Sequence, residues 1–293
     1  MNCMEQLKTK AALVENALQQ LLPDVTVAPG TIHHAMRYSC LGGGKRLRAV
    51  LAMEACRAVG GRPEDVIDFA CAIEMIHAYS LVHDDLPAMD NDDYRRGKLA
   101  NHKVFGEGIA ILTGDALLTY AFEVLAKMQH LNSELVLRLV QEVSSACGSQ
   151  GLIGGQVVDL ESEGKAVDLS TLEFIHRNKT GKLFMAALRG GALIGGADEQ
   201  QLALITAYGE NFGLAFQITD DILDVVGNAA KLGKVTGSDQ RQAKSTYVSI
   251  FGLDEARRMA QECISKCKSY AAALSVHEHC LGEIADYVLG RES

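Results

Sequence analysis

The sequence of 293 residues has little of what interrupts long helices or separates domains. Only four prolines occur, so helices can run unbroken for many residues. Alternating polar and apolar runs between hairpin turns, the pattern of β-strands, are absent from the sequence. It also contains no fixed-period repeat and no low-complexity linker. These absences predict one all-α domain over residues 1–293, with about ten or more helices on typical helix and loop lengths.

Paired cysteine motifs are also missing. None of the eight cysteines forms a Cys-x-x-Cys pair, and most lie in apolar periodic segments, such as Cys71 in "FACAIEMI". Zinc sites and disulfide frameworks usually show cysteines at characteristic spacings, which are missing here. The pattern therefore favours reduced, buried thiols. We therefore expect a cytoplasmic protein.

An excess of positive charge is absent, because the formal net charge is −9. Such a chain has no general attraction for nucleic acid or anionic lipid, so an anionic ligand must meet a local basic cluster. The N-terminus lacks the basic start and apolar run of a signal peptide. Asp115 and Glu123 interrupt the longest apolar region, 108–126, which predicts a buried helix or helix pair and no membrane insertion.

Helical periodicity is what the sequence does contain. In residues 45–60, apolar residues recur at spacings of three and four, as on one face of a helix. Gly60 and Gly61 are a plausible end for this helix. Residues 63–85 begin with Pro63 and acidic residues, which are typical of a helix start. The glycine-rich points between such segments indicate bends and close contacts within one helical domain.

Two acidic clusters lie at the ends of apolar helical segments. In the first, Asp84 and Asp85 end a helix, Pro87 breaks it, and Asp90 returns from the loop. In the second, far downstream, Asp220 and Asp224 share a helix face with Asp221 beside them. Facing each other across a bundle, the clusters would gather six carboxylates.

Six carboxylates suit a hard divalent cation such as Mg²⁺, which often shares its ligands with substrate phosphates. The alternative for either cluster alone is a solvated surface. Two matched clusters in apolar helices argue against it, because lone carboxylates are costly in apolar surroundings. A calcium-binding EF-hand loop starting at Asp90 fails, because its twelfth position is Asn101 and not Glu.

Basic residues flank these clusters. Gly42–Gly44 precede a helix start with Lys45, Arg46 and Arg48, a plausible diphosphate pocket or only a turn. Arg95 and Arg96 follow the first cluster and could simply pair with Asp92 and Asp93. "RNKTGK" brings Lys179, Thr180 and Lys182 beside Gly181, which predicts a helix irregularity there. Residues 227–247, with Lys231, Lys234 and Lys244, read as a lid over phosphate or as an ordinary polar loop.

The ordered set of motifs resembles the trans-isoprenyl diphosphate synthases from about residue 30 to 290. The motifs are "GGGKRLR", "HAYSLVHDDLPAMDNDDYRRGK", "NHKVFGE", "GDALL", "GGQVVDL", "HRNKTGKLF", "FGLAFQITDDILD" and "LGKVTGSD" followed by "KSTY". Among these synthases the chain is most similar to bacterial short-chain farnesyl diphosphate synthases, and plant-type geranylgeranyl synthases are similar too. The order of the motifs makes the resemblance specific, although each motif alone is moderate evidence.

The resemblance implies an all-α, homodimeric isoprenoid-synthase-type bundle around a deep central cavity. It implies that Asp84, Asp85, Asp90, Asp220, Asp221 and Asp224 bind about three Mg²⁺ ions, with Mn²⁺ as a substitute. Contacts to the allylic diphosphate are implied for Arg95, Lys179, Thr180, Gln217, Lys234 and Lys244, and catalytic roles for Lys179, Thr180 and Gln217. Contacts to isopentenyl diphosphate are implied for Lys45, Arg48, His77 and Arg96. From the residues alone, His77 could equally be a core histidine.

The implied reaction joins isopentenyl diphosphate head-to-tail to dimethylallyl or geranyl diphosphate. In such enzymes the positions of Tyr79 and Ser80 line the floor of the chain pocket. A bulky Tyr79 predicts farnesyl diphosphate, with fifteen carbons, as main product and the twenty-carbon geranylgeranyl diphosphate second. Two other classes remain open: a metal phosphohydrolase using "HD" at His83, and a non-catalytic synthase subunit. A terpene cyclase is less favoured, because its second motif differs from "DDILD".

Overall fold

The computed structural model describes residues 3–226, 245–274 and 277–290, and these are almost entirely helical. In chain order the α-helices are α1 (Cys3–Leu21), α2 (Gly30–Cys40), α3 (Leu47–Ala58), α4 (Ile67–Asp84), α5 (Asn101–Phe105), α6 (Glu107–Ala126), α7 (Ser133–Cys147), α8 (Leu152–Ser162), α9 (Leu169–Ile175), α10 (Lys182–Ile194), α11 (Glu199–Val226), α14 (Tyr247–Phe251), α15 (Leu253–Ala273) and α16 (Leu281–Gly290). A 3₁₀ turn, η1 (Pro63–Val66), leads into α4, and a π-helix, η2 (His176–Gly181), leads into α10. The predicted all-α fold is confirmed.

A small hairpin departs from the expectation of no strands. Strands β1 (Tyr94–Arg95) and β2 (Lys98–Leu99) pair antiparallel around Arg96 and Gly97. Both turn residues have positive φ, 52° and 75°, which is the geometry of tight hairpin turns. Strands of two residues are too short to leave an alternating pattern in the sequence.

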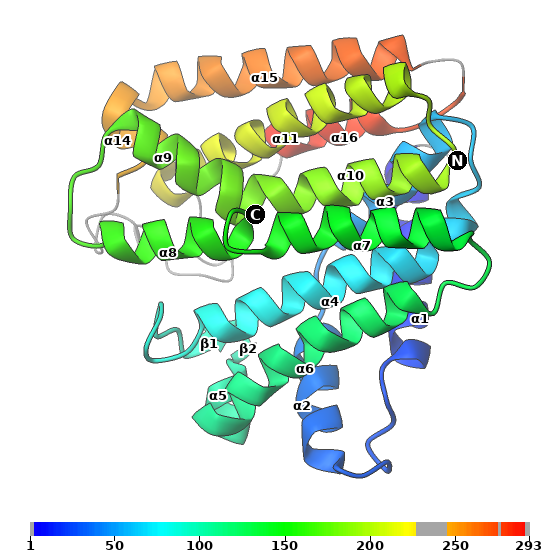
Figure 1. Cartoon of the computed structure of the whole chain (residues 1–293). Helices are drawn as coiled ribbons and strands as arrows, with labels where there is room; N and C mark the ends of the chain where they lie inside the picture. The colour runs from blue at the N-terminus through cyan, green and yellow to red at the C-terminus, as the bar shows by residue number, and fades with distance from the viewer. Residues whose placement is uncertain (1–2, 227–244, 275–276, 291–293) are drawn as a thin grey trace.

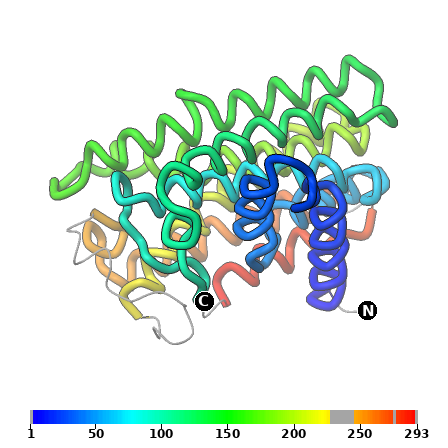
Figure 2. The backbone as a smooth tube through the Cα atoms, turned by 90° about the horizontal axis from the view of Figure 1, so that it is seen from below, coloured from blue at the N-terminus to red at the C-terminus, as the bar shows by residue number. Residues whose placement is uncertain are grey.

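The helices pack in layers around α4, α3, α10 and α11. Figure 1 shows α15, α11, α10 and α7 stacked roughly parallel, with α4 and α6 below them, and residue contacts join α11 to α15, α10 to α3, and α4 to α6. Figure 2 shows α6 and α7 (green) along one side and α15 and α16 (orange and red) on the opposite side. Helix α4 is apolar all round, with buried residues on every face, so it lies inside the bundle.

The apolar region 108–126 forms one helix, α6, which confirms the single-helix alternative of the prediction over the helix pair. Leu117, Ala121 and Leu125 are buried, but Ile111 and Leu112 are exposed, so α6 is only partly buried. Within the described residues, two helical stretches are long and apolar enough to cross a membrane by length and composition: Pro63–Asp84 and Glu107–Ala126. In the first, 67% of the most apolar window is buried inside the bundle, as in a core helix, and in the second 39%.

All eight cysteines are free thiols, and all except Cys3 are buried, which confirms the sequence interpretation. Burial raises the pKa of the Cys40 thiol to about 12 and that of Cys56 likewise to about 12. Thiols of this kind stay protonated and act as small apolar side chains in the core.

Local signals placed the ends of α4 correctly. Pro63 opens the 3₁₀ turn before α4, and Gly60, with φ 97°, follows the end of α3. Helix α4 ends at Asp84, three residues before Pro87. The first acidic cluster therefore stands at the C-terminal end of a buried helix.

Candidate active site

The loop after α4 folds back on the end of the helix. The backbone N–H of Asp90 donates to the carbonyl oxygen of Asp84 at 2.8 Å, and Asn91, with φ 55°, donates to Leu86 O at 3.1 Å. An asparagine tolerates this left-handed geometry better than most residues. The loop thus returns Asp90 to the helix end, as the sequence predicted.

Asp84 is in an environment that disfavours its negative charge. Burial is the main cause that raises the pKa of its carboxyl group to about 6; the neighbouring carboxylates Asp90 and Asp85 act in the same direction, and Lys179 and Arg95 oppose them. A divalent cation would relieve this repulsion, and carboxylate oxygens are the donors that Mg²⁺ prefers. The donor chemistry at the end of α4 therefore fits Mg²⁺.

Arg95 pairs with Asp85, which is only 2% exposed. Its Nε lies 3.0 Å from Oδ1 of Asp85, and its guanidinium also lies 3.4 Å from Asp92. The alternative pairing is therefore confirmed for Arg95 with Asp92, although Asp85 is the main partner of Arg95, and it is wrong for Arg96 and Asp93.

Arg96 instead donates to the carbonyl oxygen of Gly43, and Asp93 pairs with Lys103 at 2.8 Å. These pairings follow from the hairpin, which turns the neighbouring arginines toward different elements.

The second acidic cluster lies near the end of α11. Gln217 Nε2 donates to Oδ2 of Asp220 at 3.3 Å, one turn along the same helix. Oδ2 of the buried Asp221 accepts a hydrogen bond from the backbone N–H of Tyr247 at 2.7 Å. Asp221 thereby ties α11 to the first residue of α14, on the far side of residues 227–244 in the chain.

The π-helix η2 connects the two acidic clusters. Burial alone would lower the pKa of the Lys179 ammonium. The negative charges of Asp84, Asp90 and Asp159 outweigh burial, so the pKa of Lys179 is raised. The next residue, Thr180, donates from Oγ1 to Oε1 of Gln217 at 3.1 Å. The predicted helix irregularity is confirmed, and it brings Lys179 to one cluster and Thr180 to the other.

Helix α8 holds this π-helix closely. A Cβ atom at Gly155 would lie 2.2 Å from the backbone nitrogen of Lys179, so only glycine allows this approach. From the same helix, Asp159 Oδ2 accepts from Nζ of Lys179 at 2.7 Å. Asp159 was not singled out from the sequence, although it belongs to the motif "GGQVVDL".

The described residues do not form a complete metal cage by themselves. Among residues 3–226, 245–274 and 277–290, no three His, Cys, Asp or Glu side chains stand close enough to hold a metal ion. Mg²⁺ normally keeps waters and substrate phosphates among its ligands, so separate carboxylates suffice to bind it. The metal role of the six aspartates stays a prediction.

A pocket lies between α2, α4, the loop after α2 and the β-hairpin. His77 and Arg96, two of the predicted isopentenyl diphosphate residues, line it together with Arg95, Arg46 and Glu74. Burial, and then the nearby arginines, hold the pKa of His77 well below its ordinary value, so the imidazole is neutral. His77 thus lines the pocket as a neutral side chain, and its contact with isopentenyl diphosphate stays a prediction.

Lys45 and Arg48 do not line this pocket. The ammonium of Lys45 lies 5.5 Å from the centre of the Tyr287 ring, a cation–π contact with α16. The guanidinium of Arg48 lies 4.2 Å from the centre of the Phe184 ring. Burial lowers the pKa of Arg48 to about 10, partly offset by Glu74 and Asp220. Arg48 is therefore within electrostatic range of the pocket residue Glu74 and of Asp220 in the second acidic cluster.

The two predicted chain-length residues lie on α4 below the first cluster. Tyr79 is 4% exposed, and its ring packs edge-on against His83 with 5.9 Å between the ring centres. Ser80 Oγ donates to the carbonyl oxygen of His77 at 3.0 Å, within its own helix. His83 Nε2 lies 2.9 Å from the carbonyl oxygen of Ile111 on α6, which favours the structural interpretation of His83.

The predicted lid residues Lys231, Lys234 and Lys244 lie outside the described residues. Two buried charged residues, Arg46 and Glu74, lie beside the pocket; the sequence indicated Arg46 as one cation of a diphosphate pocket, and Glu74 was not singled out. A signal for Glu74 was present, because a lone carboxylate in the apolar run "CAIEMIHAYS" needs a partner.

Comparison with known proteins shows the family of this chain. Residues 29–281 match the family model described as polyprenyl synthetase. The chain is 46% identical to a dimethylallyltranstransferase from Fischerella ambigua (strain UTEX 1903), covering 99% of this chain and 84% of that protein. It is 42% identical to a geranylgeranyl diphosphate synthase from Cyanophora paradoxa, covering 100% and 97%. A farnesyl diphosphate synthase from Geobacillus stearothermophilus is 44% identical, covering 98% and 97%.

A solved structure shows the same fold. The crystal structure of geranylgeranyl pyrophosphate synthetase from Pyrococcus horikoshii Ot3 matches with a TM-score of 0.87 and 33% identity, covering 98% of each chain. Family match, full-length relatives and fold agree, and this chain belongs to the polyprenyl synthetase family as a short-chain prenyltransferase.

Proposed function

We propose that this prenyltransferase joins isopentenyl diphosphate head-to-tail to dimethylallyl and geranyl diphosphate and makes mainly farnesyl diphosphate. The observation that carries the proposal is the connection from Asp84 through Lys179, Thr180 and Gln217 to Asp220. This connection supports a single site in which the two carboxylate clusters flank a cation and polar side chains. Ionisation of a diphosphate ester needs such groups, because they stabilise the charges that develop.

The allylic diphosphate binds between the two acidic clusters. Asp84, Asp85, Asp90, Asp220, Asp221 and Asp224 are the candidates to hold Mg²⁺, about three ions per site, with Mn²⁺ as a substitute. Mg²⁺ supplies positive charge that stabilises the leaving diphosphate. Lys179 adds a fixed ammonium beside Asp84, and Arg95, Lys234 and Lys244 complete the binding of the phosphates.

Thr180 and Gln217 act on the organic part of the allylic substrate. Their hydrogen bond at 3.1 Å fixes two side-chain dipoles where the carbon–oxygen bond breaks. Fixed dipoles stabilise the developing allylic cation without reorganising. The π-helix supports this role, because its irregular backbone also leaves carbonyl groups outside the regular helical pattern.

The isopentenyl diphosphate binds on the basic side, at Lys45, Arg48, His77 and Arg96. The neutral imidazole of His77 and the guanidinium of Arg96 line the pocket beside the β-hairpin. The double bond of this substrate attacks the allylic cation, and the released diphosphate takes the proton that leaves. Positioning the two substrates is the main contribution of the protein.

The buried ring of Tyr79 supports a short chain pocket. With Ser80, it lies about one turn before Asp84 on α4, so a growing chain that passes between the helices meets a bulky side chain early. Farnesyl diphosphate is therefore the expected main product and geranylgeranyl diphosphate the second. The relatives carry both names, so geranylgeranyl diphosphate synthase is the alternative within the family.

We further propose a cytoplasmic homodimer. Exposed Ile111 and Leu112 on α6 give an apolar surface that a second copy of the chain could cover. Sedimentation or light scattering at micromolar concentration tests the dimer: a monomer of 31.5 kDa at all concentrations would contradict it.

Incubation of the purified protein with Mg²⁺, isopentenyl diphosphate and radiolabelled dimethylallyl diphosphate tests the function. Chromatography of the products should show chains of ten and fifteen carbons with release of diphosphate. A phosphohydrolase would release phosphate without chain growth, and a non-catalytic subunit would do neither.

A further inference from the structure

Arg46 is a buried arginine in an unusual backbone conformation. It precedes α3 with φ 49° and ψ 33°, in the left-handed region, and is 4% exposed. Its Nε donates to Oε2 of Glu15 at 2.8 Å, and its Nη2 donates to the carbonyl oxygen of Cys40 at 2.7 Å. A residue other than glycine holds this conformation only when surrounding contacts fix it.

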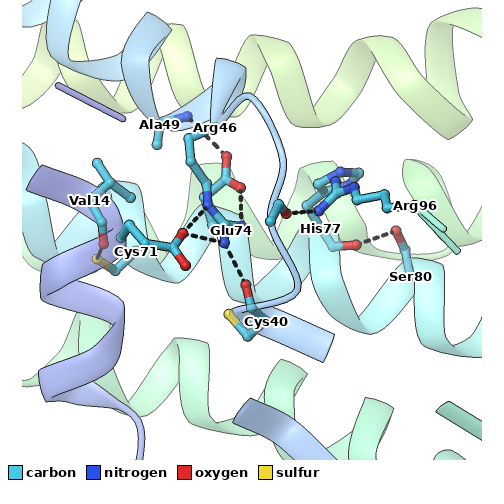
Figure 3. Close-up of polar contacts among 11 residues, drawn as sticks. Val14, Cys40, Arg46, Ala49, Cys71, Glu74, His77, Ser80 and Arg96 are labelled. Atoms are coloured by element: carbon cyan, nitrogen blue, oxygen red, sulfur yellow. Dashed lines mark hydrogen bonds and ion pairs between the residues drawn. The ribbon is translucent and has the colours of Figure 1, made fainter. Parts of the chain in front are cut away.

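Glu74 provides one of those contacts from the middle of α4. Its Oε2 accepts from Nη1 of Arg46, and its Oε1 accepts from the backbone N–H of Ala49, both at 3.3 Å. The N–H of Ala49 lies in the first turn of α3, where no helical carbonyl can accept it. Figure 3 shows Glu74 reaching both Arg46 and Ala49. Glu74 thus holds the residue before α3 and caps the first turn of α3.

The loop that Arg46 ends contains two glycines with positive φ and lies close to the pocket. Gly43 and Gly44 have φ 88° and 130°, which glycine adopts readily. The carbonyl oxygen of Gly43 accepts from Arg96, and a Cβ atom at Gly44 would lie 2.6 Å from the Arg96 guanidinium. The loop 41–46 therefore lies directly on Arg96, and it carries Lys45.

We infer that Glu74 is a positioning residue for the isopentenyl diphosphate site: through Arg46 and Ala49 it fixes the loop 41–46 and the start of α3, and so places Lys45, Arg48 and Arg96. Glu74 lines the pocket, where a carboxylate alone would repel a diphosphate. Its two oxygens are instead bonded to a guanidinium and a backbone N–H. This inference rests on the proposed assignment of the pocket to isopentenyl diphosphate.

The test compares Glu74→Ala and Glu74→Gln with the wild type in steady-state kinetics. Glu74→Ala should raise KM for isopentenyl diphosphate by about tenfold or more and leave KM for geranyl diphosphate within about twofold. Glu74→Gln keeps a carbonyl oxygen as acceptor but loses the charge that pairs with Arg46, so it should recover part of this loss, with a KM for isopentenyl diphosphate still about threefold above wild type. If Glu74→Ala is insoluble, this threefold increase in the Gln variant carries the test.

Glu54 offers a matched control on α3. It is also fully buried, pairs with Lys10 of α1, and accepts from the backbone N–H of Cys280 at 2.7 Å. Glu54→Ala and Glu54→Gln remove contacts of the same kind, an ion pair and a hydrogen bond from a backbone N–H, at a place away from the loop 41–46. We therefore expect a lower Tm and an unchanged KM for isopentenyl diphosphate.

Equal increases of both KM values in the Glu74 variants, or an equal KM increase for isopentenyl diphosphate in the Glu54 variants, would overturn the inference. An inactive wild type would instead defeat the proposed function. In that case calorimetric titration with isopentenyl diphosphate still decides: weaker binding by Glu74→Gln or Glu74→Ala, but not by the Glu54 variants, supports the positioning role. Equal binding by all of them, or by none, overturns it.

Discussion

The backbone N–H of Asp90 donates to the carbonyl oxygen of Asp84 at 2.8 Å, which brings the loop after α4 back to the helix end. Both carboxylates therefore lie at one place, and burial together with Asp90 raises the pKa of Asp84 to about 6. This bond creates the local excess of negative charge on which the metal proposal depends.

Loss of either acidic cluster should abolish turnover while leaving the fold intact. Asp84→Ala and Asp220→Ala should each lower kcat by about two orders of magnitude or more, because charge on the leaving diphosphate is no longer stabilised. Circular dichroism and Tm should stay close to wild type. The control is Asp254→Ala, an exposed aspartate at the start of α15 with a long contact to Arg257. Near-wild-type turnover in either cluster variant would defeat the two-cluster proposal.

Asp84→Asn should stabilise the metal-free protein above pH 6. The folded-state pKa of Asp84 is raised from 3.8 to about 6, so the folded state binds the proton more tightly than the unfolded state. The contribution of this group to stability is therefore fully present below pH 4 and is lost as pH rises toward 6. Asn carries no charge, so the variant does not lose this stability as pH rises. The Tm of Asp84→Asn in EDTA should therefore exceed the Tm of the wild type at pH 7.5.

The same pair of proteins provides its own control at low pH. Near pH 4 the wild-type carboxyl group is mostly protonated in the folded protein, so its charge no longer opposes folding. The difference in Tm should shrink there, and a difference independent of pH would show that charge is not its cause.

Replacing Tyr79 by Ala or Ser should lengthen the product. The Tyr79 ring is buried beside His83, and its removal opens space below Asp84 for further five-carbon units. Reverse-phase chromatography of dephosphorylated products should show a shift from fifteen toward twenty carbons or more. Tyr270→Ala removes an equal ring from α15, packed against the core, and should leave the product unchanged. An unchanged product in the Tyr79 variants would refute the floor assignment.

Thr180→Val should slow the chemical step more than it weakens binding. It removes the hydrogen bond to Gln217 and one dipole at the reacting carbon, but keeps the shape of the side chain. We expect kcat to fall by about tenfold to a hundredfold, with a small change in KM for geranyl diphosphate. Single-turnover kinetics checks this, and Thr206→Val on α11 is the control. A rise in KM with kcat unchanged would assign Thr180 to substrate binding alone.

Local sequence patterns were sufficient to predict the helices and to predict that the loop after α4 brings Asp90 back to the helix end. Pro63 begins the 3₁₀ turn that leads into α4, and Pro87 stops α4 from continuing. Gly181 ends the π-helix. The small hairpin escaped prediction, because strands of two residues show no periodicity. The sequence left a single helix or a helix pair open at 108–126, and the structure has the single helix because glycine within an apolar stretch can remain helical.

The pairing of charges could not be read from the sequence in the same way. Arg95 and Arg96 are neighbours, yet one contacts Asp85 and the other the carbonyl oxygen of Gly43. Contacts such as Arg46 with Glu15 or Tyr247 with Asp221 join residues of distant helices. They depend on how the helices pack and on positive φ angles, neither of which a local pattern specifies.

Product sizing tests the central claim most directly. Purified protein with Mg²⁺, isopentenyl diphosphate and geranyl diphosphate should yield farnesyl diphosphate as the main chain-elongated product and lose this activity in EDTA. Phosphate release from either substrate without any new carbon–carbon bond would contradict the proposal.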